Sequence, residues 1–218
     1  TMESVQNGNH QGMTKTGPDL SWHRLYLAAG ISALAASAAY LIALILTFAT
    51  PELPTSGGAA MLEYIAEHRS VFIAEQILWL APSILLTIVF LAFYPALKHI
   101  DKSWAAIGAV LGVSSWIVTL AHPATGGGAP ALVYLSDQYA MATTDAGRAA
   151  FAAAAEGFIA MNYVATLMGV LEALAVLIVS LLMLQGAFRR GIVYLGLASG
   201  AVGVVSEALK PLMGLSYA

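Results

Sequence analysis

The chain has 218 residues, of which 59% are hydrophobic and only 10% are Asp, Glu, Lys or Arg, and its formal net charge is −3. Soluble domains carry about 25% charged residues, so the composition is that of a membrane protein. The net negative charge argues against a nucleic-acid partner. The sequence contains no cysteine, which excludes disulfides, thiolate metal ligands and cysteine nucleophiles.

Residues 1–24 form a polar segment that we expect to be a cytoplasmic tail. This segment lacks the basic-then-apolar order of a cleavable signal peptide. We therefore expect the first apolar segment to remain in the mature protein.

Five apolar segments follow that are long enough to cross a bilayer of about 30 Å. They cover residues 25–49, 71–97, 104–121, 158–184 and 191–209. The predicted fold class is all-α: one polytopic transmembrane helix bundle over residues 25–218, with about five spans. Pro82 predicts a kink in the second span.

Two connections are long and acidic, residues 50–70 and 122–157, whereas the short connections carry Lys98, Lys102, Arg189 and Arg190. The positive-inside rule then predicts a cytoplasmic N-terminus, both long connections outside, and an outside C-terminus. We expect a multi-pass membrane protein.

Each long connection is expected to contain helix. The apolar residues Met61, Leu62, Tyr64 and Ile65 predict a short helix at the membrane interface. The second connection predicts a helix near residues 130–141, and then an alanine-rich helix capped by Thr144 or Asp145 that continues into the fourth span. A membrane-embedded helix within residues 130–155 would raise the number of spans to six.

Glu172 is the single charged residue in the fourth apolar segment. A carboxylate at the centre of a span costs on the order of 2.5–3.5 kcal/mol on the lenient insertion scale. On a helical wheel its face is shared by mostly small or polar residues, namely Asn162, Ala165, Gly169, Val176 and Ser180. Two interpretations stay open: a carboxyl group protonated or hydrogen-bonded between helices, and a functional pocket.

Other polar residues fall at the outer ends of the predicted spans. They are Glu75, His122, Glu156, Asn162 and Glu207. With the deeper Glu172, they predict an outward-facing polar pocket or proton site. Trp79 and Trp116 either flank this pocket or pack in the bundle.

Lys210 lies three residues after Glu207 and immediately before Pro211. We assign it to the same pocket, where pairing with Glu207 or extension towards the interface is favoured over covalent chemistry.

Small-residue spacings predict close helix packing, at Gly108-x-x-x-Gly112 and at Gly196-x-x-x-Gly200. Packing within the bundle is the favoured interpretation, and a homo-oligomer or a membrane complex through the same glycines is the alternative. Membrane lipids are the other expected partners.

No sequence pattern indicates a catalytic or metal centre. HExxH and HxH spacings, a Ser-His-Asp order, a phosphate loop and a dinucleotide fingerprint are all absent from the sequence. We predict no catalytic residues, no metal ligands and no cofactors.

The segment over residues 177–209 resembles small bacterial membrane proteins classed as a domain of unknown function. The resemblance rests on the run Leu182-Met183-Leu184-Gln185-Gly186, the basic turn Arg189-Arg190 and the helix start Tyr194-Leu195-Gly196. It implies a helical inner-membrane protein and contributes no catalytic residues.

The leading functional hypothesis is a non-enzymatic membrane protein. Its outward pocket would take a small amphipathic or lipid-like ligand, or the protein would be an accessory subunit of a membrane complex. The alternatives are a small proton-coupled transporter using Glu172 and an intramembrane enzyme.

Overall fold

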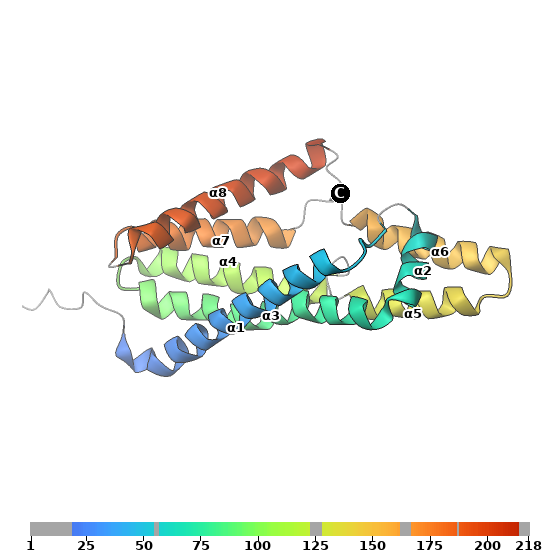
Figure 1. Ribbon diagram of the computed structural model, residues 1–218. Helices are drawn as coiled ribbons and strands as arrows, with labels where there is room; N and C mark the ends of the chain where they lie inside the picture. Colours follow the sequence, from blue (N-terminus) through green and yellow to red (C-terminus); the bar gives the residue numbers. More distant parts are fainter. Residues whose placement is uncertain (1–18, 55–56, 123–127, 162–166, 187, 214–218) are drawn as a thin grey trace, which may run out of the picture.

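The computed structural model describes residues 19–54, 57–122, 128–161, 167–186 and 188–213. Within these ranges the chain forms eight α-helices, a short 3-10 turn η1 (Leu20–Trp22) and no strand (Figure 1). Five helices are long and apolar: α1 (His23–Ala49), α3 (Arg69–Leu97), α4 (Lys102–Ala121), α7 (Leu167–Met183) and α8 (Arg190–Met213). The predicted all-α membrane bundle is confirmed.

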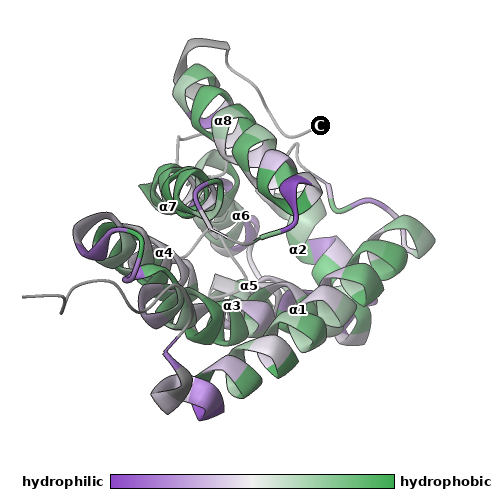
Figure 2. Ribbon diagram, turned by 90° about the vertical axis from the view of Figure 1, so that its left-hand side faces the viewer, coloured by the Kyte–Doolittle hydropathy of each residue, from purple (hydrophilic) through white to green (hydrophobic). Residues whose placement is uncertain are grey.

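The five long helices pack in the order α1, α3, α4, α7, α8, each against its neighbours in that series. Seen along the bundle they form an arc with α1 and α8 at its two ends (Figure 2). Such a curved row has one inner, concave face and one outer, convex face.

Four of these helices are long and apolar enough to cross a membrane, namely α1, α3, α4 and α8 through Leu209. The fifth, α7, is apolar but has 17 residues. The structure therefore supports four to five spans, and their bounds lie within about two residues of the sequence prediction except in the fourth segment.

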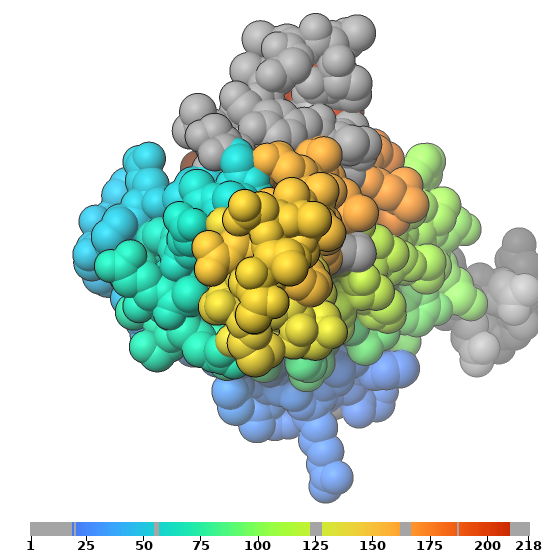
Figure 3. All heavy atoms as spheres, turned by 90° about the vertical axis from the view of Figure 1, so that its right-hand side faces the viewer, coloured from blue at the N-terminus to red at the C-terminus, as the bar shows by residue number. Residues whose placement is uncertain are grey.

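Three shorter helices pack together at one end of the bundle: α2 (Gly58–Glu67), α5 (Ala129–Met141) and α6 (Asp145–Met161). We call this group the helical cap; it covers much of that end in Figure 3. Its core contains Met61, Tyr64, Ile65, Phe72, Ala129 and Ile159. The predicted apolar face of α2 thus packs against protein.

Polar contacts hold the helical cap together. Gly58 N donates to Glu156 Oε1 at 2.7 Å and Ser136 Oγ donates to Leu62 O at 2.7 Å. Arg69 at the start of α3 forms an ion pair with Asp137 on α5. These contacts couple α2 to both α5 and α6.

The alanine-rich segment folds differently from the prediction of one helix running into the fourth span. The cap at Thr144 is confirmed, because Gly147 N donates to its Oγ1 at 3.1 Å. However, α6 ends at Met161 and packs in the helical cap, whereas α7 begins at Leu167 and packs between α4 and α8. The two helices therefore pack against different neighbours. Residues 162–166, which join them, lie outside the described ranges.

The opposite end of the bundle carries the two short connections (Figure 1). Asp101 caps α4 by accepting from Ser103 N at 2.9 Å and Trp104 N at 3.0 Å. Lys98 Nζ donates to Asp19 Oδ2 at 2.8 Å, and this bond holds the pKa of the Asp19 carboxyl well below its usual range. The two long connections thus share one end and the basic ones the other, as the predicted topology requires.

The glycines of the predicted packing motifs contact neighbouring helices of the same chain. A Cβ at Gly108 would lie 3.2 Å from Ile178 and Val179 of α7, and one at Gly112 would overlap the Phe90 ring of α3. In α8, Gly196 faces Ser180, and Gly200 faces the α7 backbone at Leu177 and Ala173. An oligomer or complex stays a prediction, and it would have to use other surfaces.

We predict that Gly200→Ala lowers the stability of the bundle. The new methyl group would lie 2.9 Å from Leu177 N and 3.1 Å from Ala173 O, so α7 and α8 must separate. Overpacking of this kind costs about 1–3 kcal/mol. The matched control is Gly30→Ala, where nothing lies within 4 Å. Thermal unfolding in mild detergent should show a lower midpoint for Gly200→Ala alone; equal midpoints would contradict the close packing.

We also predict opposite labelling of the two ends in intact cells. Because the chain has no cysteine, single exposed cysteines at Ala149 of α6 and Ser103 of α4 report independently. A membrane-impermeant maleimide should label Ala149→Cys in intact cells and Ser103→Cys only after lysis. The reverse pattern would overturn the assigned orientation.

Candidate functional site

Two carboxyl groups from neighbouring spans meet where α7 and α8 pack together. The Glu207 carboxyl lies against the α7 backbone at Gly169, where an added Cβ would be 2.5 Å from its Oε1. Gly169 precedes Glu172 by three residues, so both positions lie on the same face of α7. A side chain at position 169 would therefore require the Glu207 carboxyl to move.

The electrostatic neighbours of Glu172 come from both ends of the arc. Its carboxyl group lies close enough to interact with the charge of Glu207, and the Tyr40 hydroxyl of α1 interacts with Glu172. All three residues are half-buried. We call Tyr40, Glu172 and Glu207 the acidic cluster. Two carboxylates that share a poorly hydrated site repel each other, and a shared proton or a bound cation relieves this repulsion.

Aromatic rings lie next to the acidic cluster. The ring of Tyr40 is 5.6 Å from that of Trp79 on α3, and the Trp79 side chain remains 40% exposed. Trp116 of α4 packs with Ala175, which follows Glu172 by three residues. The buried Trp116 Nε1 has no hydrogen-bond acceptor among the described residues. The surroundings of the acidic cluster therefore combine negative charge with aromatic rings.

A hydrogen bond from α4 fixes the start of α7 beside this site. Ser115 Oγ donates to Met168 O at 2.8 Å, directly next to Gly169. Ser115 is fully buried, so this bond is shielded from competing solvent. It holds the segment against which Glu207 packs.

Glu75 belongs to a separate group nearer the helical cap. It accepts from Thr50 Oγ1 at 3.3 Å, and Thr50 lies ten residues beyond Tyr40, about 15 Å along the axis of α1. Tyr64 OH donates to Pro51 O at 2.8 Å, and burial, with a contribution from the charge of Glu75, raises the pKa of that phenol. Trp79, one turn after Glu75, lies between this group and Tyr40.

The remaining predicted residues occupy three different settings. Glu156 supports the start of α2 in the helical cap, and the half-buried His122 terminates α4. Asn162 lies outside the described residues, as does the side chain of Lys210. The described part of the predicted pocket thus comprises the acidic cluster and the Glu75 group.

Tyr40 is the site residue that sequence reasoning missed. It lies in a predominantly apolar span whose other hydroxyl groups belong to Tyr26, Ser32, Ser37 and Thr47. A polar group in a span needs a partner, but this signal does not distinguish Tyr40 from the other four. Its proximity to Glu172 depends on how the arc curves, which the sequence pattern does not show.

The described residues bring no three His, Asp or Glu side chains together as a metal site. Comparisons with protein-family models, curated proteins and solved structures find no match to this chain. The resemblance of residues 177–209 to a domain of unknown function therefore stays a prediction.

We predict that Glu172→Gln stabilises the protein at alkaline pH. At pH 9 the substitution removes one of two repelling charges. At pH 5 carboxyl groups are more often protonated, so the difference in stability between the variant and the wild type is smaller. A relief of about 1 kcal/mol corresponds to roughly 2–4 °C in the unfolding midpoint.

The control is Glu52→Gln, the same chemical change at an exposed position. Thermal unfolding in mild detergent at pH 5 and pH 9 makes the comparison. A midpoint that falls at pH 9 for Glu172→Gln would mean that a cation, and not a second carboxylate, is the dominant neighbour.

Proposed function

We propose that this chain is a non-enzymatic, multi-pass protein of the inner membrane that binds a small amphipathic cation at the acidic cluster. The observation that carries the proposal is the seating of the Glu207 carboxyl against Gly169, within reach of Glu172. A carboxylate in a membrane span is costly unless its charge is compensated, and a cationic ligand would compensate that of Glu172.

The chemistry of the surroundings favours an organic cation over an inorganic ion. Tyr40 and Trp79 offer ring faces that attract a cation, and Phe90, Trp116 and Val176 form an apolar layer beside them. Carboxylates would bind the charged group of the ligand, and the rings would bind its apolar body. A hydrated metal ion would gain little from contact with these aromatic and aliphatic side chains.

A proton-coupled carrier is the second candidate, and the same pair of acids favours it. A proton and an organic cation would compete for Glu172 and Glu207, so that binding of one releases the other. Exchange of this kind at a site within the membrane is the elementary step of coupled transport. The two candidates differ only in whether the site opens to both sides.

Binding of ethidium, an amphipathic aromatic cation, tests the proposal. The purified protein in mild detergent is titrated at pH 8, and bound dye is measured by equilibrium dialysis. Because removing one partner of a buried charged contact costs about 2–5 kcal/mol, Glu172→Gln and Glu207→Gln should each weaken binding more than tenfold. Lowering the pH to 5 should weaken binding by the wild-type protein.

Glu52→Gln serves as the matched control and should bind like the wild type. Equal binding by Glu172→Gln and the control, or binding that ignores pH, would contradict the proposal. In proteoliposomes, ethidium uptake driven by an imposed pH gradient and lost in Glu172→Gln would favour the carrier. Binding without uptake would favour the binding protein.

A further inference from the structure

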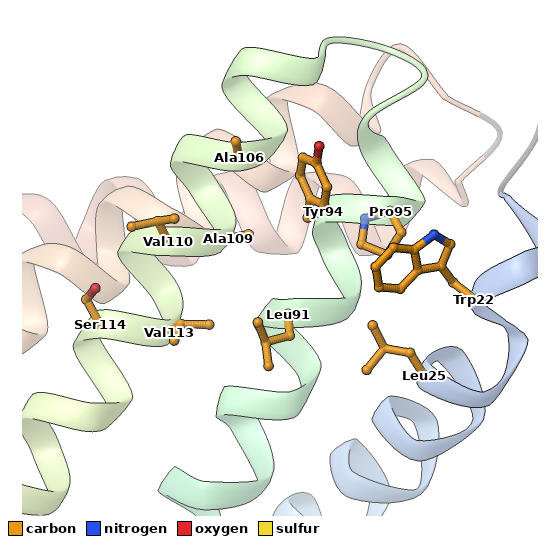
Figure 4. Close-up of a pocket in the computed structure, with 10 residues that line it drawn as sticks. All are labelled: Trp22, Leu25, Leu91, Tyr94, Pro95, Ala106, Ala109, Val110, Val113 and Ser114. Atoms are coloured by element: carbon orange, nitrogen blue, oxygen red, sulfur yellow. The ribbon is translucent and has the colours of Figure 1, made fainter.

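An apolar groove lies at the basic end of the bundle, away from the acidic cluster. It has a volume of about 600 Å³, within the range of pockets that bind small molecules. Figure 4 shows its lining from four elements: Trp22 of η1 and Leu25 of α1 on one side, Leu91, Tyr94 and Pro95 of α3 between, and the α4 residues opposite. Those α4 residues are Ala106, Ala109, Val110, Val113 and Ser114.

The groove opens sideways, towards the region that lipid would occupy. Leu91 is 48% exposed and Val110 is 63% exposed, although both line the groove. From Ala106 to Ser114 the groove follows α4 over nine residues, about 12 Å along the helix axis. An elongated, open, carbon-lined slot fits an alkyl chain and offers almost no partners for a polar ligand.

Two lysines lie one helical turn from lining residues, on the same faces of α3 and α4. Lys98 follows Tyr94 by four residues, and Lys102 precedes Ala106 by four, so each lysine lies one turn from a groove residue. Lys98 Nζ also lies 5.6 Å from the centroid of the Trp22 ring at the mouth. The exposed Arg24 adjoins Leu25 on α1.

The acidic residues at the mouth already have partners. Asp19 accepts from Lys98, and Asp101 accepts from backbone N–H groups at the start of α4. Among the described residues no carboxylate pairs with the exposed Lys102. A phosphodiester group would supply the negative partner of this lysine.

We propose that this groove binds an anionic phospholipid, with an acyl chain between α1, α3 and α4 and the phosphate at Lys102 and Lys98. The inference does not depend on the proposed function. The basic end is the predicted cytoplasmic end, and the cytoplasmic leaflet is the one rich in anionic lipids. Charge at the mouth and carbon along the slot together select such a lipid over a zwitterionic one.

The test uses the full chain reconstituted with phospholipids that carry brominated acyl chains, which quench tryptophan fluorescence on contact. Brominated phosphatidylglycerol should quench the wild type at lower mole fraction than brominated phosphatidylcholine. The difference should disappear in Trp22→Phe, which removes the fluorophore at the mouth.

Two further variants distinguish the contribution of the lipid headgroup to binding from that of the acyl chain. Lys102→Gln should weaken the preference for phosphatidylglycerol about fivefold, the value of one charge near an anionic surface. Ala106→Phe should fill the slot and reduce quenching by both lipids. Arg190→Gln, at the same end but between α7 and α8, is the matched control and should behave like the wild type.

Equal quenching by both lipids in the wild type would overturn the proposal, and this comparison holds even if Ala106→Phe fails to fold. An equal effect of Arg190→Gln and Lys102→Gln would also overturn it, because general surface charge would then explain the preference. A dimer in mild detergent that Ala106→Phe converts to a monomer would show instead that a second copy of the chain fills the groove.

Discussion

The close approach of α7 and α8 determines the rest of the site. Gly196, Gly200 and Gly203 bring α8 against the α7 backbone, where ordinary side chains would hold the helices apart. At this separation the Glu207 side chain lies along α7 as far as Gly169, and its carboxyl group lies near Glu172. A packing feature thereby places two carboxyl groups near each other in the apolar part of the bundle. This placement is the geometric basis for proposing a proton or ligand there.

The arc of helices gives the bundle two faces with different chemistry. In the acidic cluster, Tyr40 of α1 and Glu207 of α8 lie within electrostatic range of Glu172 on α7. The apolar groove between α1, α3 and α4 lies at the basic end and opens to lipid through Leu91 and Val110. The helical cap covers the other end of the bundle. A ligand site and a lipid site are thus separated in space and can be tested independently.

Much of the fold follows from patterns that the sequence displays directly. Apolar runs of sufficient length predict spans, Thr144 and the residues after it predict a helix start, and the glycine spacings predict close packing; the structure bears these out. The sequence was less informative about features that depend on which residues become neighbours in the folded chain. The composition of the alanine-rich segment predicts a helix but does not show which helices it packs against. In the structure α6 packs against α2 and α5, whereas α7 packs against α4 and α8. Likewise, no periodic pattern in the sequence marks Tyr40. Glu75 was assigned to the same pocket as Glu172 from its predicted depth alone, whereas in the structure it accepts a hydrogen bond from Thr50 and belongs to a separate group.

The contact between Gly169 and Glu207 is the central claim, and a cysteine pair tests it most directly. A Cβ at Gly169 would lie 3.0 Å from Glu207 Cγ, so the two Cβ atoms fall near the roughly 3.5–4.5 Å separation of a disulfide. In the double variant Gly169→Cys with Glu207→Cys, oxidation should link the tryptic fragments that cleavage at Arg189 and Arg190 would otherwise separate. The control pair, Gly169→Cys with Leu195→Cys, should not link, because Leu195 lies twelve residues, about 18 Å, from Glu207 along α8. Fragments of the first pair that separate after oxidation would contradict the arrangement on which the acidic cluster rests.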